Sequence, residues 1–294
     1  MKKKILALCL VVVLAVTAVT SATLAYFTDK VADKNTFVVG NVKIVQNEEQ
    51  RPVDADGKYT DGTVIGFVDD QALVPAVIPG SKSGSYDDTI TVADGKEYMI
   101  WDESINGEID KFISVTNKGT EEAYVRTIIA FEDDAACTLT PALHTSWGFN
   151  ADGTYVEATA KPNEEGEWVE LPDADVVWLL DANGNYLTIG LGDGTLHSVA
   201  VVTYNVALAT GETSKPSLMQ LWLDPAATNE WSAKVGEKYT IYAASLAVQA
   251  DGFKDASTAM DTAFDLTKEN LASWLSGAIK TDDKNNVVGG TVTE

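Results

Sequence analysis

The sequence predicts an all-β protein: an antiparallel, jelly-roll-like β-sandwich with an inserted region and short C-terminal helices. The first observation is that apolar and polar residues alternate with a period of two over most of the chain after residue 26. The second is a series of turn dipeptides between the alternating runs, and the third is that helical spacing occurs only near the C-terminus. The turn dipeptides are Asp56-Gly57, Asp152-Gly153, Asn183-Gly184 and Asp193-Gly194.

The composition is that of a globular protein with a sizeable core. Of 294 residues, 45% are hydrophobic and 22% are charged, which suits one large all-β domain. The 21 Lys and Arg residues face 44 Asp and Glu residues, so the formal net charge is -23. Because an acidic surface repels polyanions, we expect no nucleic-acid partner and no binding to anionic membranes.

Residues 1–25 have the pattern of a secretory signal peptide. A basic start at Lys2, Lys3 and Lys4 precedes the apolar run 5–20, and the small residues Thr23 and Ala25 favour cleavage before Tyr26. The same run is the basis of an alternative, an uncleaved membrane anchor, although it is short of the roughly 20 residues that a spanning helix needs. We expect a secreted protein with no stable membrane anchor after cleavage.

Residues 26–280 are interpreted as a single β-sandwich domain. The segment 35–46 (NTFVVGNVKIVQ) alternates around Phe37, Val39, Val42 and Ile44 and predicts the first strand of this domain. The turn-rich region 132–193 is interpreted as an insertion. Further strands are expected within residues 62–70, 88–94, 111–133, 176–212 and 238–253.

Two helices are expected at about residues 254–279. The runs KDASTAMDTAFD and TKENLASWLSGAIK each place apolar residues on one face, and Thr267 is positioned to cap the second helix. We expect both helices to cover the sandwich. The tail 281–294 is predicted to be disordered.

No catalytic or metal-binding residue is predicted, and we expect no enzyme. The two His residues, His144 in a loop or core edge and His197 on a strand, form no zinc motif. Cys137 is alone in the mature chain, next to acids that raise a thiol pKa. The runs DADGKYTDGT and DANGNY are similar to calcium loops but have glycine at the fourth position, which favours hairpin turns. A loosely bound Ca²⁺ stays open as an alternative, and no other cofactor is expected.

The mature N-terminus resembles that of a known family. The matching residues are Ala25, Tyr26, Phe27, Thr28, Asp29, Asn35, Thr36, Phe37 and Gly40. Weaker matches are the Pro-Gly loop in VIPGSKSGSYDDTITV, the turn and Tyr-Val-Arg of ISVTNKGTEEAYVRTIIAFE, and VQADGF. Together these pieces resemble the TasA/camelysin family, whose precursors are cut by a signal peptidase of the SipW type.

The resemblance implies a secreted structural protein of the biofilm matrix, at the surface of a Gram-positive bacterium. It implies fibres in which the N-terminal strand of one subunit completes a sheet of the next, so that the partners are copies of the chain or related matrix subunits. Some members are described as metallopeptidases, but the zinc motif is missing here. The expected assembly strand contains Tyr26, Phe27, Thr36, Phe37, Val39, Val42 and Ile44.

Two questions stay open at this point. The sequence does not decide whether the N-terminal strand pairs within its own subunit or with a neighbour. The first alternative function is a monomeric secreted binding or adhesion module, in which the loop HTSWGFN presents Trp147 and Phe149 to a ligand. The second, which the sequence favours less, is a camelysin-like metallopeptidase.

Overall fold

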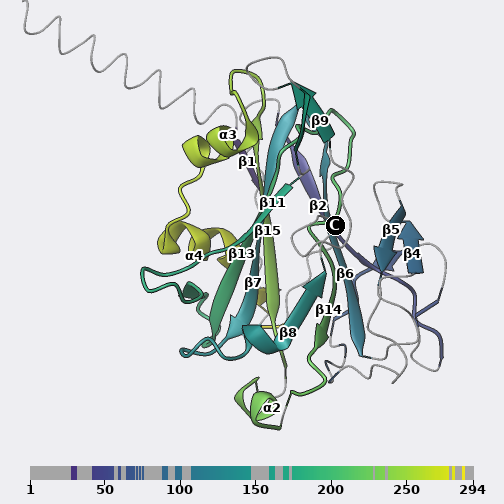
Figure 1. Ribbon diagram of the computed structural model, residues 1–294, viewed down its shortest axis with the longest axis vertical. Coiled ribbons are helices and arrows are strands. Elements are labelled where there is room, and N and C mark those ends of the chain that lie inside the picture. The colour runs from purple at the N-terminus through teal and green to yellow at the C-terminus, as the bar shows by residue number, and fades with distance from the viewer. Residues whose placement is uncertain are drawn as a thin grey trace, which may run out of the picture.

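The computed structural model contains two antiparallel β-sheets packed face to face, with helices along one outer face (Figure 1). This arrangement confirms the predicted antiparallel β-sandwich with short C-terminal helices. The structure describes residues 28–31, 42–55, 59–60, 64–69, 71, 73, 75, 88–91, 97–100, 107–146, 159–162, 168–171, 174–227, 229–235, 238–277, 280–281 and 287–288.

The first sheet has the strand order β1-β15-β7-β13-β11, and β12 also pairs with β13. Its strands are β1 (Thr28–Val31), β7 (Ala123–Asp133), β11 (Ala174–Trp178), β12 (Thr188–Gly190), β13 (Leu196–Tyr204) and β15 (Ile241–Gln249). All its pairings are antiparallel. The strand β7 lies at the centre, so it pairs along most of its length with β13 on one side and β15 on the other.

The second sheet has the order β3-β2-β6-β14-β8. Its strands are β2 (Ile44–Gln50), β3 (Ile65–Gly66), β6 (Glu108–Asn117), β8 (Leu143–Ser146) and β14 (Leu218–Leu223). The pairing of β6 with β14 shifts register between Leu218 and Gln220, as at a β-bulge. In the part of the chain that the structure describes, three two-stranded pairs lie outside both sheets: β4 (Asp88–Thr91) with β5 (Glu97–Ile100), β9 (Thr159–Pro162) with β10 (Trp168–Leu171), and β16 (Lys280–Thr281) with β17 (Val287–Val288).

The main core fills the space between the two sheets. There, Ile113 and Val115 from β6 pack with Val125, Ile129 and Phe131 from β7. All five side chains are fully buried. The alternate residues of β7 face the other way and are also buried, under the helices. Burial on both faces explains why β7 reads as a nearly continuous apolar run instead of a clean alternation.

Among the described residues, three helices flank the two sheets: α2 (Asn229–Val235), α3 (Ala256–Ala263) and α4 (Lys268–Ser276). The last two lie on the outer face of the first sheet (Figure 1), and Phe264 packs edge-on against Trp274 between them. The predicted cap is confirmed, because the Thr267 hydroxyl accepts a hydrogen bond from the Asn270 backbone N–H at 3.2 Å. Helix α2 was not predicted; its Trp231 packs on Leu139 at one end of the sandwich.

The region interpreted as an insertion, residues 132–193, supplies strands at the margins of both sheets. The strand β8 is the outermost strand of the second sheet, and β11 is the outermost strand of the first. In the predicted disordered tail, Thr281 of β16 pairs with Val287 of β17. The predicted signal peptide, residues 1–25, lies outside the described residues, as do Trp147 and Phe149.

Candidate interaction site at the N-terminal edge

The first described strand, β1, lies at the margin of the first sheet and pairs antiparallel with β15 of its own chain. Thr28 is opposite Val248 and Val31 is opposite Ser245. With four residues, β1 covers less than half of the nine residues of β15. Strand β2 belongs to the opposite sheet, so the chain crosses from one sheet to the other on this side. We call the group β1, β15 and β2 the N-terminal edge.

The second strand of this edge, β2, is built into the core. Val42 and Ile44 are 2% and 3% exposed, and each such burial stabilises the fold by about 1.5–3 kcal/mol. Strand β2 pairs with β6 over six residues, from Ile44 opposite Asn117 to Glu49 opposite Phe112. Two members of the expected assembly strand, Val42 and Ile44, therefore lie inside their own subunit. The predicted cleavage-site residues Thr23, Ala25 and Tyr26 lie outside the described residues. So do the other members of the expected assembly strand, Phe27, Thr36, Phe37 and Val39.

A polar side chain of β2 reaches across the sandwich to the first sheet. The Gln46 amide donates a hydrogen bond to the Ala243 carbonyl of β15 at 3.4 Å, and the Ser245 hydroxyl donates to Gln46 Oε1 at 2.7 Å. Ser245 Oγ also lies 3.1 Å from the Thr127 hydroxyl of β7. Gln46 therefore fixes the position of β2 along β15, because a shift by one residue would break these bonds.

A buried ion pair holds the next inward-facing residue of β2. Lys111 Nζ of β6 lies 2.6 Å from Glu48 Oε2, with both side chains at most 6% exposed. The ammonium also lies 3.8 Å from the centre of the Phe67 ring, which favours a cation. Removing one member of such a pair leaves a buried charge without a partner and costs about 3–5 kcal/mol. On the other face, the Asn47 amide donates to the Ser114 and Thr116 hydroxyls of β6.

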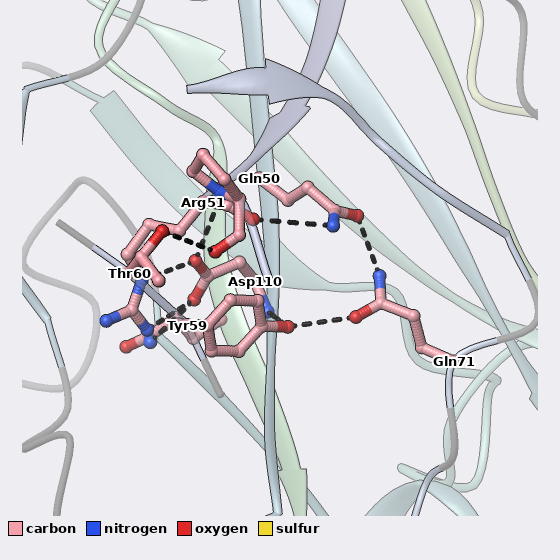
Figure 2. A network of polar contacts seen from close by, with 8 residues as sticks. Gln50, Arg51, Tyr59, Thr60, Gln71 and Asp110 are labelled. Atoms are coloured by element: carbon pink, nitrogen blue, oxygen red, sulfur yellow. Dashed lines mark hydrogen bonds and ion pairs between the residues drawn. The ribbon is translucent and has the colours of Figure 1, made fainter. Parts of the chain in front are cut away.

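A second polar network lies where β2 ends, centred on Asp110 (Figure 2). Arg51 Nε and Nη2 donate to the two oxygens of the Asp110 carboxylate at 2.6 and 2.9 Å. The Arg51 backbone N–H and the Gln220 amide donate to the same carboxylate at 3.1 and 2.9 Å. Asp110 is 0% exposed, so these four donors replace the water that an exposed carboxylate would bind.

The network extends to the segment that leads from β2 to β3 and beyond. The Tyr59 hydroxyl accepts from the Asp110 backbone N–H at 3.0 Å and donates to Gln71 Oε1 at 2.9 Å. The amides of Gln71 and Gln50 point toward one another in Figure 2, and Gln71 Nε2 donates to Gln50 Oε1 at 2.8 Å. Burial is the largest cause that raises the pKa of Tyr59, so its phenol stays neutral and keeps donating. The segment is thereby fixed beside β2, where Ile65 pairs with Gln50.

The predicted strand position of His197 is confirmed, and the structure places it in a buried polar cluster. His197 lies in β13 with 0% exposure; its Nε2 is 3.4 Å from Asp193 Oδ2, and its ring is 5.2 Å from that of Tyr242. Burial lowers the pKa of His197 against the opposing effect of the Asp193 and Asp133 carboxylates. Glu132, the cross-strand partner of His197, has a pKa raised chiefly by burial.

Three other features that the sequence singled out, His144, Cys137 and the run DANGNY, lie among the described residues. His144 lies on the outermost strand β8, with Nε2 2.8 Å from Asp224 Oδ2. Burial, with the nearby Asp133 and Asp134 carboxylates, raises the pKa of the Cys137 thiol. In the run DANGNY, the Asp181 carboxylate accepts from the backbone N–H groups of residues 183 and 185, which is the expected hairpin turn.

Among the residues that the structure describes, no three His, Cys, Asp or Glu side chains stand close enough together to hold a metal ion. In the same part of the chain, no helix is both long and apolar enough to cross a membrane. Comparison with protein-family models, with curated proteins and with solved structures found no match for this chain.

The Asp110 network yields a stability prediction. Asp110→Asn keeps the shape of the side chain but leaves the Arg51 guanidinium buried without a counterion, so we expect the free energy of unfolding to fall by about 3–5 kcal/mol in urea titrations. Asp251→Asn, in an exposed turn, is the matched control and should change stability by less than about 0.5 kcal/mol. Equal effects of the two substitutions would contradict the central role of Asp110.

The His197 cluster yields a pH prediction. The pKa of His197 is lower in the folded chain than the value of about 6.5 expected when unfolded, so the unfolded state binds more protons as the pH falls. This contribution to stability is complete above the unfolded pKa and is lost on acidification. His197→Gln should therefore lose less unfolding free energy between pH 7 and pH 5 than the unsubstituted chain. Equal losses of unfolding free energy in the two chains between pH 7 and pH 5 would contradict this prediction.

Proposed function

We propose that the chain is a secreted structural protein of an extracellular biofilm matrix, and that its subunits assemble into fibres by donating the N-terminal strand to a neighbour. The observation that carries the proposal is the position of β1: a four-residue strand at the margin of a sheet, paired only with β15 among the described strands. A second copy of the same strand can make the same backbone hydrogen bonds, so exchange between subunits needs no new interface chemistry.

The proposal includes the processing step that the signal junction suggests. Cleavage before Tyr26 by a signal peptidase of the SipW type would create an N-terminus two residues ahead of Thr28, where β1 begins. Until cleavage, the leader would hold this strand at the membrane of a Gram-positive cell. The proposed partners are other copies of this chain or related matrix subunits, and the proposal assigns no peptidase activity because the sequence has no zinc motif.

One observation favours a second candidate function, a monomeric secreted binding or adhesion module. Strand β1 already completes the first sheet of its own subunit, so the sandwich is closed without a neighbour. Light scattering of the mature chain over a range of concentration, pH and salt separates the two candidates. A strict monomer under every condition supports the module and contradicts the fibre subunit.

The fibre proposal is tested by removing the strand. The mature chain, residues 26–294, should form fibres visible by electron microscopy, and a chain that starts at Asn41 should form none because it lacks β1. A chain of residues 26–280, shortened at the other end, is the control and should still assemble. Fibres from the chain that starts at Asn41 would refute assembly through β1.

The acidity of the chain yields a further prediction about assembly. The formal net charge is -23, and removal of the leader takes away three lysines and no acids, so mature subunits repel one another at neutral pH. We expect assembly, followed by light scattering, to be faster at pH 5 than at pH 8 in low salt, and faster at pH 8 when salt is added. Equal rates under all three conditions would contradict electrostatic control.

A further inference from the structure

Strands β1 and β2 of the N-terminal edge are attached to the rest of the molecule in different ways. Strand β1 has one strand neighbour among the described residues, β15, and pairs with it over four residues. Strand β2 pairs with β6 over six residues and with β3 on its other side, and its side chains bond to both sheets. Short strands at a sheet margin open locally at much lower free energy than strands fixed in the core.

We propose that exchange between subunits is confined to β1, while β2 stays in its own subunit, and that the acceptor edge is the stretch 245–248 of β15. The occupant of that edge is the strand Thr28–Val31 of a second copy. The identity of the occupant rests on the proposed function. The division between an exchanging and a fixed strand rests only on the contacts of this chain, and it falls between Val31 and Val42.

The fixed state of β2 follows from the charges that it covers. If β2 left, Lys111 would keep its buried position without Glu48, and Asp110 would lose Arg51, which directly follows β2. A strand from a neighbour could restore both ion pairs only if it placed its own Glu48 and Arg51 in the same register. The strand β1, in contrast, can separate without breaking either ion pair.

Gln46 sets the end of the acceptor edge. Its amide NH2 donates a hydrogen bond to the Ala243 carbonyl, and its Oε1 accepts one from the Ser245 hydroxyl. A side chain of β2 is therefore bonded to β15 where the pairing of β1 with β15 ends. In the observed register Val31 lies opposite Ser245. An incoming strand that ran further along β15 would have to displace Gln46. The exchanged strand therefore takes the same register as β1 does within its own subunit.

The test uses the mature chain, residues 26–294, and two labelled peptides. A peptide of residues 26–41 should bind in trans by displacing β1, and a peptide of residues 42–50 should bind at least about tenfold more weakly. With a photoreactive residue in place of Asp29, the first peptide should attach to β15 near Ala247, its cross-strand partner. A peptide of residues 26–41 with reversed sequence is the control.

Two engineered disulfides, both in a Cys137→Ser background, distinguish the role of β1 from that of β2. Asn47→Cys with Ser114→Cys joins cross-strand partners of β2 and β6, and oxidation should leave binding of the 26–41 peptide within about twofold. Asp29→Cys with Ala247→Cys joins β1 to β15, and oxidation should weaken that binding at least about tenfold, with recovery on reduction.

The outcomes distinguish a failure of this inference from a failure of the proposed function. The inference is overturned if the 26–41 peptide does not bind, if the 42–50 peptide binds equally well, or if the disulfide on β2 blocks binding. If the 26–41 peptide binds as described but the mature chain never forms fibres, the proposed function fails and the inference stands. If fibres form and the disulfide on β2 prevents them, the inference fails while the proposed function stands.

Discussion

The burial of the Asp110 carboxylate is the constraint on which the second sheet depends. A carboxylate with no exposed surface is tolerated only when donors replace its water, and here two nitrogens of the Arg51 side chain, the Arg51 backbone and Gln220 do so. Because Arg51 directly follows β2 and Gln220 belongs to β14, one side chain joins three strands. The backbone N–H of Asp110 also donates a hydrogen bond to the Tyr59 hydroxyl, and this bond fixes the segment next to β3. This arrangement fixes the position of β2 in the second sheet.

The sequence was a good guide to the elements and a poor guide to their contacts. Alternation around Ile44 and along 111–133 predicted strands, and the Thr267 cap predicted the start of α4, because these signals are local. The partners of Asp110 lie 59 and 110 positions away in the chain, and no spacing rule links residues that distant. Helix α2 was missed because its seven residues are too few to show a period of 3.6.

The candidate site shows the same limit. A period of two marks a strand whether its partner is in the same subunit or in another, so the pattern around Val42 and Ile44 left the partner open. Only the folded structure places those two residues in the core of their own chain. The buried charges of β2 were also hidden, since Glu48 and Lys111 look like ordinary surface residues in the sequence.

The acidity of the chain has a different local meaning from its global one. The net charge makes whole chains repel one another, whereas individual carboxylates at turns accept hydrogen bonds from backbone N–H groups, as those of Asp134 and Asp181 do. In the interior, Glu132 and His197 respond to acid in opposite directions, because burial favours the neutral form of each. Proton uptake at Glu132 favours the folded state, and proton uptake at His197 opposes it.

The antiparallel contact of β1 with β15 also has a mechanical consequence. In a fibre built by exchange of β1, tension on the donor strand acts along the strand axis, so the hydrogen bonds between the two strands are sheared together and do not open one at a time. The load then passes to β15, which is paired with β7 over all nine of its residues, and so enters the centre of the sheet. A strand of only four residues would thus be loaded in the direction in which its hydrogen bonds resist best.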